Sequence, residues 1–299
     1  MGAVNFVKLD AADPTLLGAI VLWSCHGPIR HDKLRTAWLD DGLDEGLLLS
    51  PTSPYVALRR AMELAESDAR VRPMRDSKDE AVPEGTGSEA EGFVYVYERR
   101  RAGRPVYERG LEVVLDKASP TGITFGGKRD ADIEDLILAA FERTSRLVEP
   151  SDVGAWLRRL AVKRLNATTV RDTGGVYFIP PVGVPQWLAW SAVVETASSR
   201  YNLQTIPAMR TKEAISAVLS AFTAEIQADV EKITEQADDR GGDATSRFKT
   251  MKAKALQSLF DRVVEYEGIL GQRLTDLRDS LEKVSYKVGV QMLLAGGEE

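Results

Sequence analysis

The chain has 299 residues, of which 43% are hydrophobic and 28% are charged, and its formal net charge at pH 7 is -6. These values are typical of a folded globular protein with one or two domains, and the acidic balance argues against a protein that binds polyanions over its whole surface. A single cysteine, Cys25, excludes an intramolecular disulfide framework and a cysteine-rich zinc site. Residues 1–10 lack a signal-peptide pattern and no apolar run reaches 18 residues, so we expect a cytoplasmic protein without a membrane span.

The N-terminal segment, residues 1–75, is expected to be helical or α+β. Residues 16–23 are mostly apolar and fit a buried strand or a short helix. Residues 31–39 predict a helix. A second helix is predicted over residues 54–69, because Ser53 is a suitable N-cap and a proline occupies the first helical position. Residues 76–91 are rich in Asp, Glu, Gly, Ser and Pro, which predicts a flexible acidic loop.

Residues 92–210 predict an α+β body that contains a small antiparallel β-meander. Its best strand is residues 93–97, a run of aromatic and β-branched side chains. The meander continues through residues 106–115, with Gly110 as a candidate bulge, and through residues 123–125. Three helices are predicted after the meander, at residues 130–147, 152–165 and 186–197. Two short strands are predicted at residues 176–179 and 203–206.

Residues 211–292 predict a long helical hairpin or coiled coil, and residues 293–299 a disordered tail. Apolar residues keep a 4-3 spacing in the last part of this region, and together with the polar Glu267 they are called the heptad seam below. The apolar members are Leu256, Phe260, Val263, Leu270, Leu274, Leu277, Leu281, Val284 and Val288. Because two glycines follow Glu267 closely, we expect the helix to bend or change partners at residues 267–271. The part after the bend, from Leu270 to Val288, is expected to contact the body or a neighbouring subunit.

The segment Gly174-Gly175-Val176-Tyr177-Phe178-Ile179-Pro180, together with the helix before it and the coiled coil after it, resembles an uncharacterised family of bacterial and phage proteins. The resemblance suggests a context of phage biology or antiphage defence. It implies no activity and no site residues.

Residues suited to catalysis are scarce. The two histidines are His26 and His31, and Cys25 is adjacent to His26. Neighbouring residues in a strand point to opposite faces, so a Cys–His nucleophile is not expected from this pair. Phosphate-binding glycine loops and a Gly-x-Ser-x-Gly motif are missing from the sequence. We therefore expect a protein that is not an enzyme and needs no metal or cofactor.

Two basic clusters stand out against the acidic background. The first lies at the tip of the predicted hairpin and consists of Arg99, Arg100, Arg101 and Arg104. The second consists of Arg158, Arg159, Lys163 and Arg164 on the predicted helix near residue 160, with Arg171 after it. Helix, turn and strand in succession over residues 151–177 would suit a winged-helix-like module that contacts phosphates. The alternative is that both clusters are simply solvated surface.

Two functions fit the sequence. The first is a non-enzymatic scaffold that forms homo-oligomers or docks a partner protein through the heptad seam, with Leu270, Leu274, Leu277, Leu281, Val284 and Val288 as interface candidates. The motivation is that soluble proteins seldom leave such an apolar strip exposed. The alternative is a nucleic-acid-binding protein that uses residues 151–171 and the hairpin-tip arginines.

Overall fold

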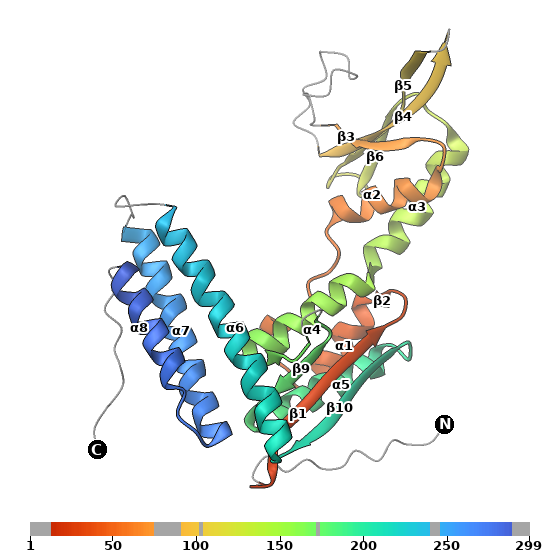
Figure 1. Ribbon diagram of the computed structural model, residues 1–299. Helices are drawn as coiled ribbons and strands as arrows, with labels where there is room; N and C mark the ends of the chain where they lie inside the picture. The colour runs from red at the N-terminus through yellow and green to blue at the C-terminus, as the bar shows by residue number, and fades with distance from the viewer. Residues whose placement is uncertain (1–12, 75–90, 102–103, 172–173, 240–245, 289–299) are drawn as a thin grey trace. The chain divides into compact units, whose positions relative to one another are not determined.

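The computed structural model describes residues 13–74, 91–101, 104–171, 174–239 and 246–288, and the chain divides into two compact units (Figure 1). The first unit consists of residues 1–25 and 154–299, and the second of residues 26–153. The second unit is therefore inserted after the first strand, a division that the expected boundaries at 75 and 92 did not anticipate. The expected acidic loop, except residue 91, and the expected C-terminal tail lie outside the described residues.

The first unit combines an antiparallel sheet with helices. Its elements are β1 (Leu16–Cys25), most of α4 (Pro150–Arg164), β8 (Thr168–Thr169), β9 (Val176–Ile179), η2 (Pro181–Gly183), α5 (Val184–Ala197), β10 (Tyr201–Met209), α6 (Lys212–Asp238), α7 (Ser246–Leu270) and α8 (Thr275–Val288). The strand order is β10-β1-β9-β8, so β1 has a partner on each side.

The two faces of this sheet are covered by different helices. On one face Phe178 packs in a common core with residues of α6, α7 and α8. On the other face Trp23 stacks on Tyr177, with ring centroids 5.0 Å apart, and also contacts Trp187 of α5. Because both faces of the sheet are covered, β1 reads as a nearly continuous apolar run rather than an alternating one.

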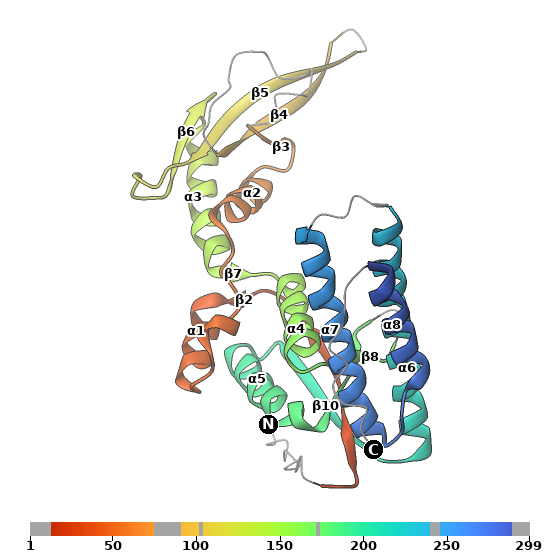
Figure 2. The same ribbon diagram turned by 90° about the vertical axis from the view of Figure 1, so that its left-hand side faces the viewer.

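The C-terminal region is a bundle of three helices, not the predicted hairpin of two (Figure 2). The second predicted helix ends at Leu270, because Gly271 adopts a φ of 70° that side chains other than glycine rarely accept. After the turn, α8 packs against both α6 and α7. The helix therefore ends within residues 267–271, where a bend or a change of partners was expected, but the part after it packs on α6 and α7 of the same bundle.

All apolar members of the heptad seam are buried inside this bundle. The six interface candidates, Leu270, Leu274, Leu277, Leu281, Val284 and Val288, are each 8% exposed or less. They share one core with Phe222 and Ile226 of α6. The assignment of these residues to an interface between chains was therefore wrong in its premise, since the strip is covered by the chain's own helices.

The second unit carries the predicted meander. Its elements are β2 (Ile29–Arg30), α1 (His31–Asp40), η1 (Glu45–Leu47), α2 (Pro54–Ala65), β3 (Arg70–Pro73), β4 (Gly92–Arg101), β5 (Arg104–Leu115), β6 (Ile123–Gly127), α3 (Ala131–Arg146), β7 (Leu147–Val148) and the start of α4. The sheet has the order β3-β4-β5-β6 and is antiparallel throughout, as predicted. Helices α2 and α3 form a core with the apolar residues of this sheet.

Two local predictions in this unit are confirmed. The Ser53 hydroxyl accepts a hydrogen bond from the backbone N–H of Val56 and caps α2. The register between β4 and β5 shifts where Gly110 and Leu111 lie opposite Tyr95, so Gly110 does form a bulge. A Cβ atom at Gly110 would lie 2.5 Å from the Tyr97 ring, which explains the glycine.

Glu267, the polar position of the heptad seam, holds the turn between α7 and α8. Its carboxylate accepts hydrogen bonds from the Leu274 backbone N–H at 2.8 Å and from the Arg278 guanidinium, whose Nε lies 2.9 Å away. The hydrogen bond from Arg278 lowers the pKa of Glu267 below its ordinary value of 4.5. An isolated polar residue in the heptad pattern therefore marks the point where the helix ends.

We predict that Glu267→Gln lowers the free energy of unfolding by about 1–2 kcal/mol at neutral pH, because the hydrogen bonds lose their charge. The contribution of the wild-type carboxylate is present above pH 4.5 and is lost as the pH falls through its lower folded-state pKa. Urea unfolding of both proteins should therefore show a difference that shrinks in acid. Glu231→Gln, at an exposed position of α6, is the control, and equal stability of Glu267→Gln and wild type at neutral pH would contradict the prediction.

Candidate nucleic-acid interface

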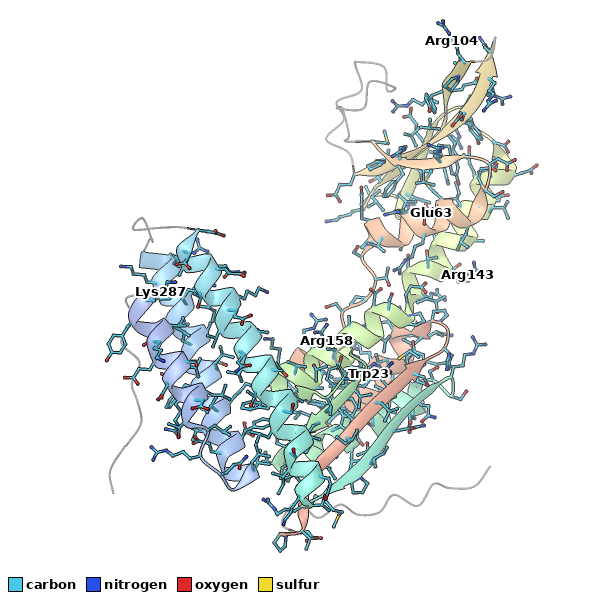
Figure 3. The ribbon with its side chains drawn as sticks, viewed as in Figure 1. Trp23, Glu63, Arg104, Arg143, Arg158 and Lys287 are labelled. Atoms are coloured by element: carbon cyan, nitrogen blue, oxygen red, sulfur yellow. The ribbon has the colours of Figure 1, made fainter. Side chains whose placement is uncertain are left out.

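One side of α4 is basic and the other is buried. The four cationic side chains of the predicted cluster, Arg158, Arg159, Lys163 and Arg164, are all exposed. Trp156 and Leu160, on the opposite side, are 2% and 3% exposed. Figure 3 labels Arg158 on this helix. The expected amphipathic helix is thus present, with a solvent-facing side that carries only positive charge between residues 158 and 164.

Within the part of the chain that the structure describes, no ion pair involves any of these four residues. Other exposed arginines do find carboxylates: Arg35 pairs with Glu45 at 2.7 Å, and Arg59 pairs with Glu63 at 2.8 Å. The chain contains more acidic than basic residues, so partners for the α4 cations are not scarce overall. The positive charges on this side of α4 are therefore not balanced by ion pairs within the described residues.

The chain after α4 does not form the expected winged-helix-like module. Asn166, with a left-handed φ of 52°, turns the chain from α4 into the short strand β8. The next strand, β9, pairs with β1 as an inner strand of the sheet. The β8–β9 hairpin is therefore part of the sheet of the first unit and is not a free wing. The basic side of α4 does not belong to a winged-helix-like module.

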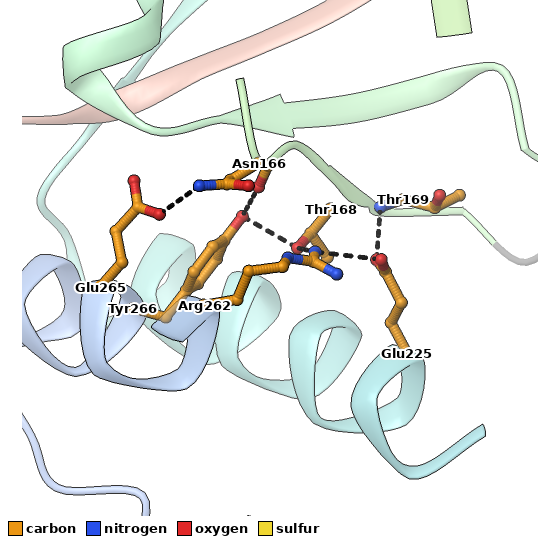
Figure 4. A network of polar contacts seen from close by, with 7 residues as sticks. All are labelled: Asn166, Thr168, Thr169, Glu225, Arg262, Glu265 and Tyr266. Carbon is orange, nitrogen blue, oxygen red and sulfur yellow. Dashed lines mark hydrogen bonds and ion pairs between the residues drawn. The ribbon is translucent and has the colours of Figure 1, made fainter. Parts of the chain in front are cut away.

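A buried polar network fixes the end of α4 to the bundle (Figure 4). The Tyr266 hydroxyl donates to the backbone carbonyl of Asn166 at 2.9 Å and accepts from the Thr168 hydroxyl at 2.8 Å. The Asn166 side chain donates to Glu265 at 2.6 Å. Burial raises the pKa of the Tyr266 phenol, so this hydroxyl remains a donor at physiological pH.

The network continues to α6 through a charged pair. Arg262 pairs with Glu225 at 3.0 Å, and the second oxygen of Glu225 accepts from the Thr169 backbone N–H at 3.2 Å. The Arg262 guanidinium lies 5.6 Å from the centre of the Phe222 ring, which stacks on Tyr266 with centroids 3.9 Å apart. The sequence did not single out Arg262 or Glu225, since a charged residue in a long helix usually faces solvent.

The arginines at the hairpin tip form a second basic surface, which belongs to the second unit. Arg99 pairs with Glu108 at 2.9 Å. Arg100, Arg101 and Arg104 have no ion pair among the residues described. Arg101 lies directly opposite Arg104, which Figure 3 labels at the hairpin tip. Like charges at opposite positions destabilise a hairpin, so this tip is not arranged for stability.

Cys25 and His31 were among the residues considered for catalysis. Burial raises the pKa of the Cys25 thiol to about 11, which disfavours the thiolate that a nucleophile requires. His31 Nε2 lies 2.8 Å from the carbonyl oxygen of Leu49. Across the described ranges there is no group of three or more His, Cys, Asp or Glu side chains placed to hold a metal ion, and none of the helices there has the length and apolarity to cross a membrane.

We predict that Tyr266→Phe lowers the free energy of unfolding by roughly 1–3 kcal/mol, because the buried Thr168 hydroxyl loses its acceptor and the Asn166 carbonyl loses a donor while the aromatic stack remains. Tyr286→Phe is the matched control, since Tyr286 is 75% exposed, and should change stability by less than about 0.5 kcal/mol. Chemical denaturation measures both. If the two variants were equally stable, the network would not fix α4 to the bundle.

Comparison with known families places the chain in an uncharacterised group, as the sequence suggested. Residues 16–296 match the model of a family of unknown function, DUF6744. No curated protein matches the chain, and neither does any solved structure. Because the matched residues make up most of the sequence, the chain belongs to this family of unknown function, DUF6744.

Proposed function

We propose that the first unit binds nucleic acid through the basic side of α4. The observation that carries this proposal is that Arg158, Arg159, Lys163 and Arg164 are exposed and without ion pairs among the described residues of an acidic chain. Residues 158–164 span about 9 Å of helix at 1.5 Å per residue. This length corresponds to roughly three phosphates along one strand of a duplex.

The arrangement supports contacts to the backbone of the nucleic acid rather than to its bases. Arginine and lysine side chains that neutralise phosphates bind largely without regard to sequence, and the affinity falls steeply with salt. The network around Tyr266 supports the end of the helix on a rigid bundle, so the cations would be presented from a fixed position. The binding that we propose is therefore tolerant of sequence and sensitive to salt.

We include the hairpin tip of the second unit as a second surface that contacts nucleic acid. A two-stranded β-ribbon fits the major groove of DNA, and three arginines at its tip lack carboxylate partners within the described residues. The scaffold hypothesis, by contrast, loses the observation that motivated it, because the heptad seam is buried within one chain. Nucleic-acid binding is for this reason the better supported of the two functions.

We predict that the triple variant Arg158→Glu, Arg159→Glu, Lys163→Glu binds labelled single- and double-stranded DNA at least about tenfold more weakly than wild type at low salt. It should also reduce the slope of log affinity against log salt, because fewer counterions are released. Fluorescence anisotropy at several salt concentrations measures both quantities.

The control is a triple variant with the same change of net charge, Lys249→Glu, Lys254→Glu, Lys283→Glu, at exposed positions of α7 and α8. Equal losses in the two triple variants would mean that only net charge matters, and the proposed interface on α4 would be wrong. A variant with Arg100, Arg101 and Arg104 changed to Glu separates the two basic surfaces. If only that variant lost binding, the hairpin and not α4 would be the interface.

A further inference from the structure

A pocket of about 300 Å³ lies in the first unit, between the end of α4 and the facing sides of α6 and α7. Its wall includes four cationic side chains from the three helices, which are Lys163, Lys232, Lys252 and Arg262. Asp229 is the acidic residue of the lining. Cations from three helices thus converge on one small space.

The charges of this pocket do not balance. Arg262 is neutralised by its pair with Glu225. The three lysines remain, against the single carboxylate of Asp229, and in the described part of the chain no ion pair involves any of these four residues. About two positive charges of the lining are therefore without an ion-pair partner among the described residues.

Lys252 makes this imbalance costly because it is only 7% exposed. Its ammonium donates a hydrogen bond to the Gln236 amide oxygen and lies 5.4 Å from the centre of the Phe248 ring. Both contacts are favourable, but neither supplies a negative charge. A buried ammonium is normally paired with a carboxylate, since its desolvation is expensive.

Arg262 provides a second, independent observation that points to a ligand in this pocket. The residue is 8% exposed, and its buried Nε–H has no hydrogen-bond acceptor. Buried donors without partners are rare in folded proteins. An under-satisfied guanidinium and an uncompensated ammonium thus line the same pocket.

We propose that this pocket binds a phosphate group. A phosphate dianion matches two uncompensated positive charges, whereas a single carboxylate would match only one. Its oxygens can accept from several lysines at once. The volume lies at the lower end for small-molecule sites and suits a phosphate with a small organic substituent.

The phosphate can come from a free compound or from the end of a nucleic-acid strand. Lys163 lines the pocket and also belongs to the basic side of α4, which would lead a strand to the pocket. The inference does not depend on the proposed function, because a free phosphate compound would occupy the pocket without any strand.

The test measures thermal unfolding of the full chain with inorganic phosphate, with a nucleoside monophosphate, and with acetate at equal ionic strength. We expect either phosphate compound to raise the melting temperature of the wild type more than acetate does, by mass action on the folded state. Lys252→Met should melt at a higher temperature than wild type without phosphate, because the uncompensated charge is gone. It should bind phosphate at least about tenfold more weakly by calorimetry.

Lys254→Met, at an exposed position of the same helix, is the matched control and should bind phosphate as the wild type does. Lys232 lies on the exposed rim of the pocket, and Lys232→Met should weaken phosphate binding several-fold. This variant tests the proposal if Lys252→Met does not fold. The proposal is overturned if phosphate and acetate act alike, or if both lining variants bind phosphate as the wild type does. It is also overturned if phosphate stabilises all variants equally.

Oligonucleotides with and without a 5′-phosphate distinguish the two sources of phosphate. Stronger binding of the phosphorylated strand, lost in Lys232→Met and Lys252→Met, assigns the pocket to a strand end and supports the proposal. Phosphate binding without any oligonucleotide binding supports the pocket while it refutes the proposed interface on α4.

Discussion

The first unit depends on one buried junction, in which Tyr266 of α7 meets the turn between α4 and β8. The ring stacks on Phe222 of α6 and touches the edge of Phe178 in the sheet. Its hydroxyl is held by Thr168 and by the carbonyl of Asn166. A single side chain thus connects two helices of the bundle to the sheet and to the end of α4. The basic side of α4 and the cationic pocket both belong to the elements that this side chain connects.

This junction explains how α4 can carry four positive charges close together on one side. A helix with four uncompensated cations on one side gains nothing from surface ion pairs, and its attachment has to come from the buried side. Trp156 and Leu160 supply the apolar part of that attachment, and the turn at Asn166 supplies the polar part. The Arg262–Glu225 pair adds a charged link, in which Glu225 also accepts a hydrogen bond from the Thr169 backbone N–H.

Much of the local structure could be predicted from the sequence, because it rests on short-range rules. The strand at residues 93–97, the cap at Ser53 and the bulge at Gly110 each follow from a few neighbouring residues. The reversal at Gly271 was only partly foreseen, since a 4-3 pattern fits one long helix as well as two antiparallel ones. The insertion of residues 26–153 could not be foreseen, because it depends on β1 pairing with β9 and β10, which follow it by about 150 residues or more.

The candidate sites show the same contrast between features that follow from neighbouring residues and features that depend on long-range packing. The exposed cations of α4 were predictable from helical periodicity, whereas the burial of Lys252 and the partners of Tyr266 were not. Lysine and arginine within a long polar helix are usually solvated, and the pattern of one helix does not show which helix covers it. Only the packing of α4, α6 and α7 brings Lys163, Lys232 and Lys252 to one pocket.

The position of β1 in the sheet has a consequence for biosynthesis. Strand β1 leaves the ribosome well before β9 and β10, its two partners, and about 150 residues of chain separate its end from the start of β9. At about 5–20 residues per second, this interval lasts roughly 8–30 s. The intervening unit has its own core and is synthesised completely within that time. An apolar strand without partners is a template for aggregation, so the nascent chain must keep β1 from pairing wrongly until the end of the sheet has been made.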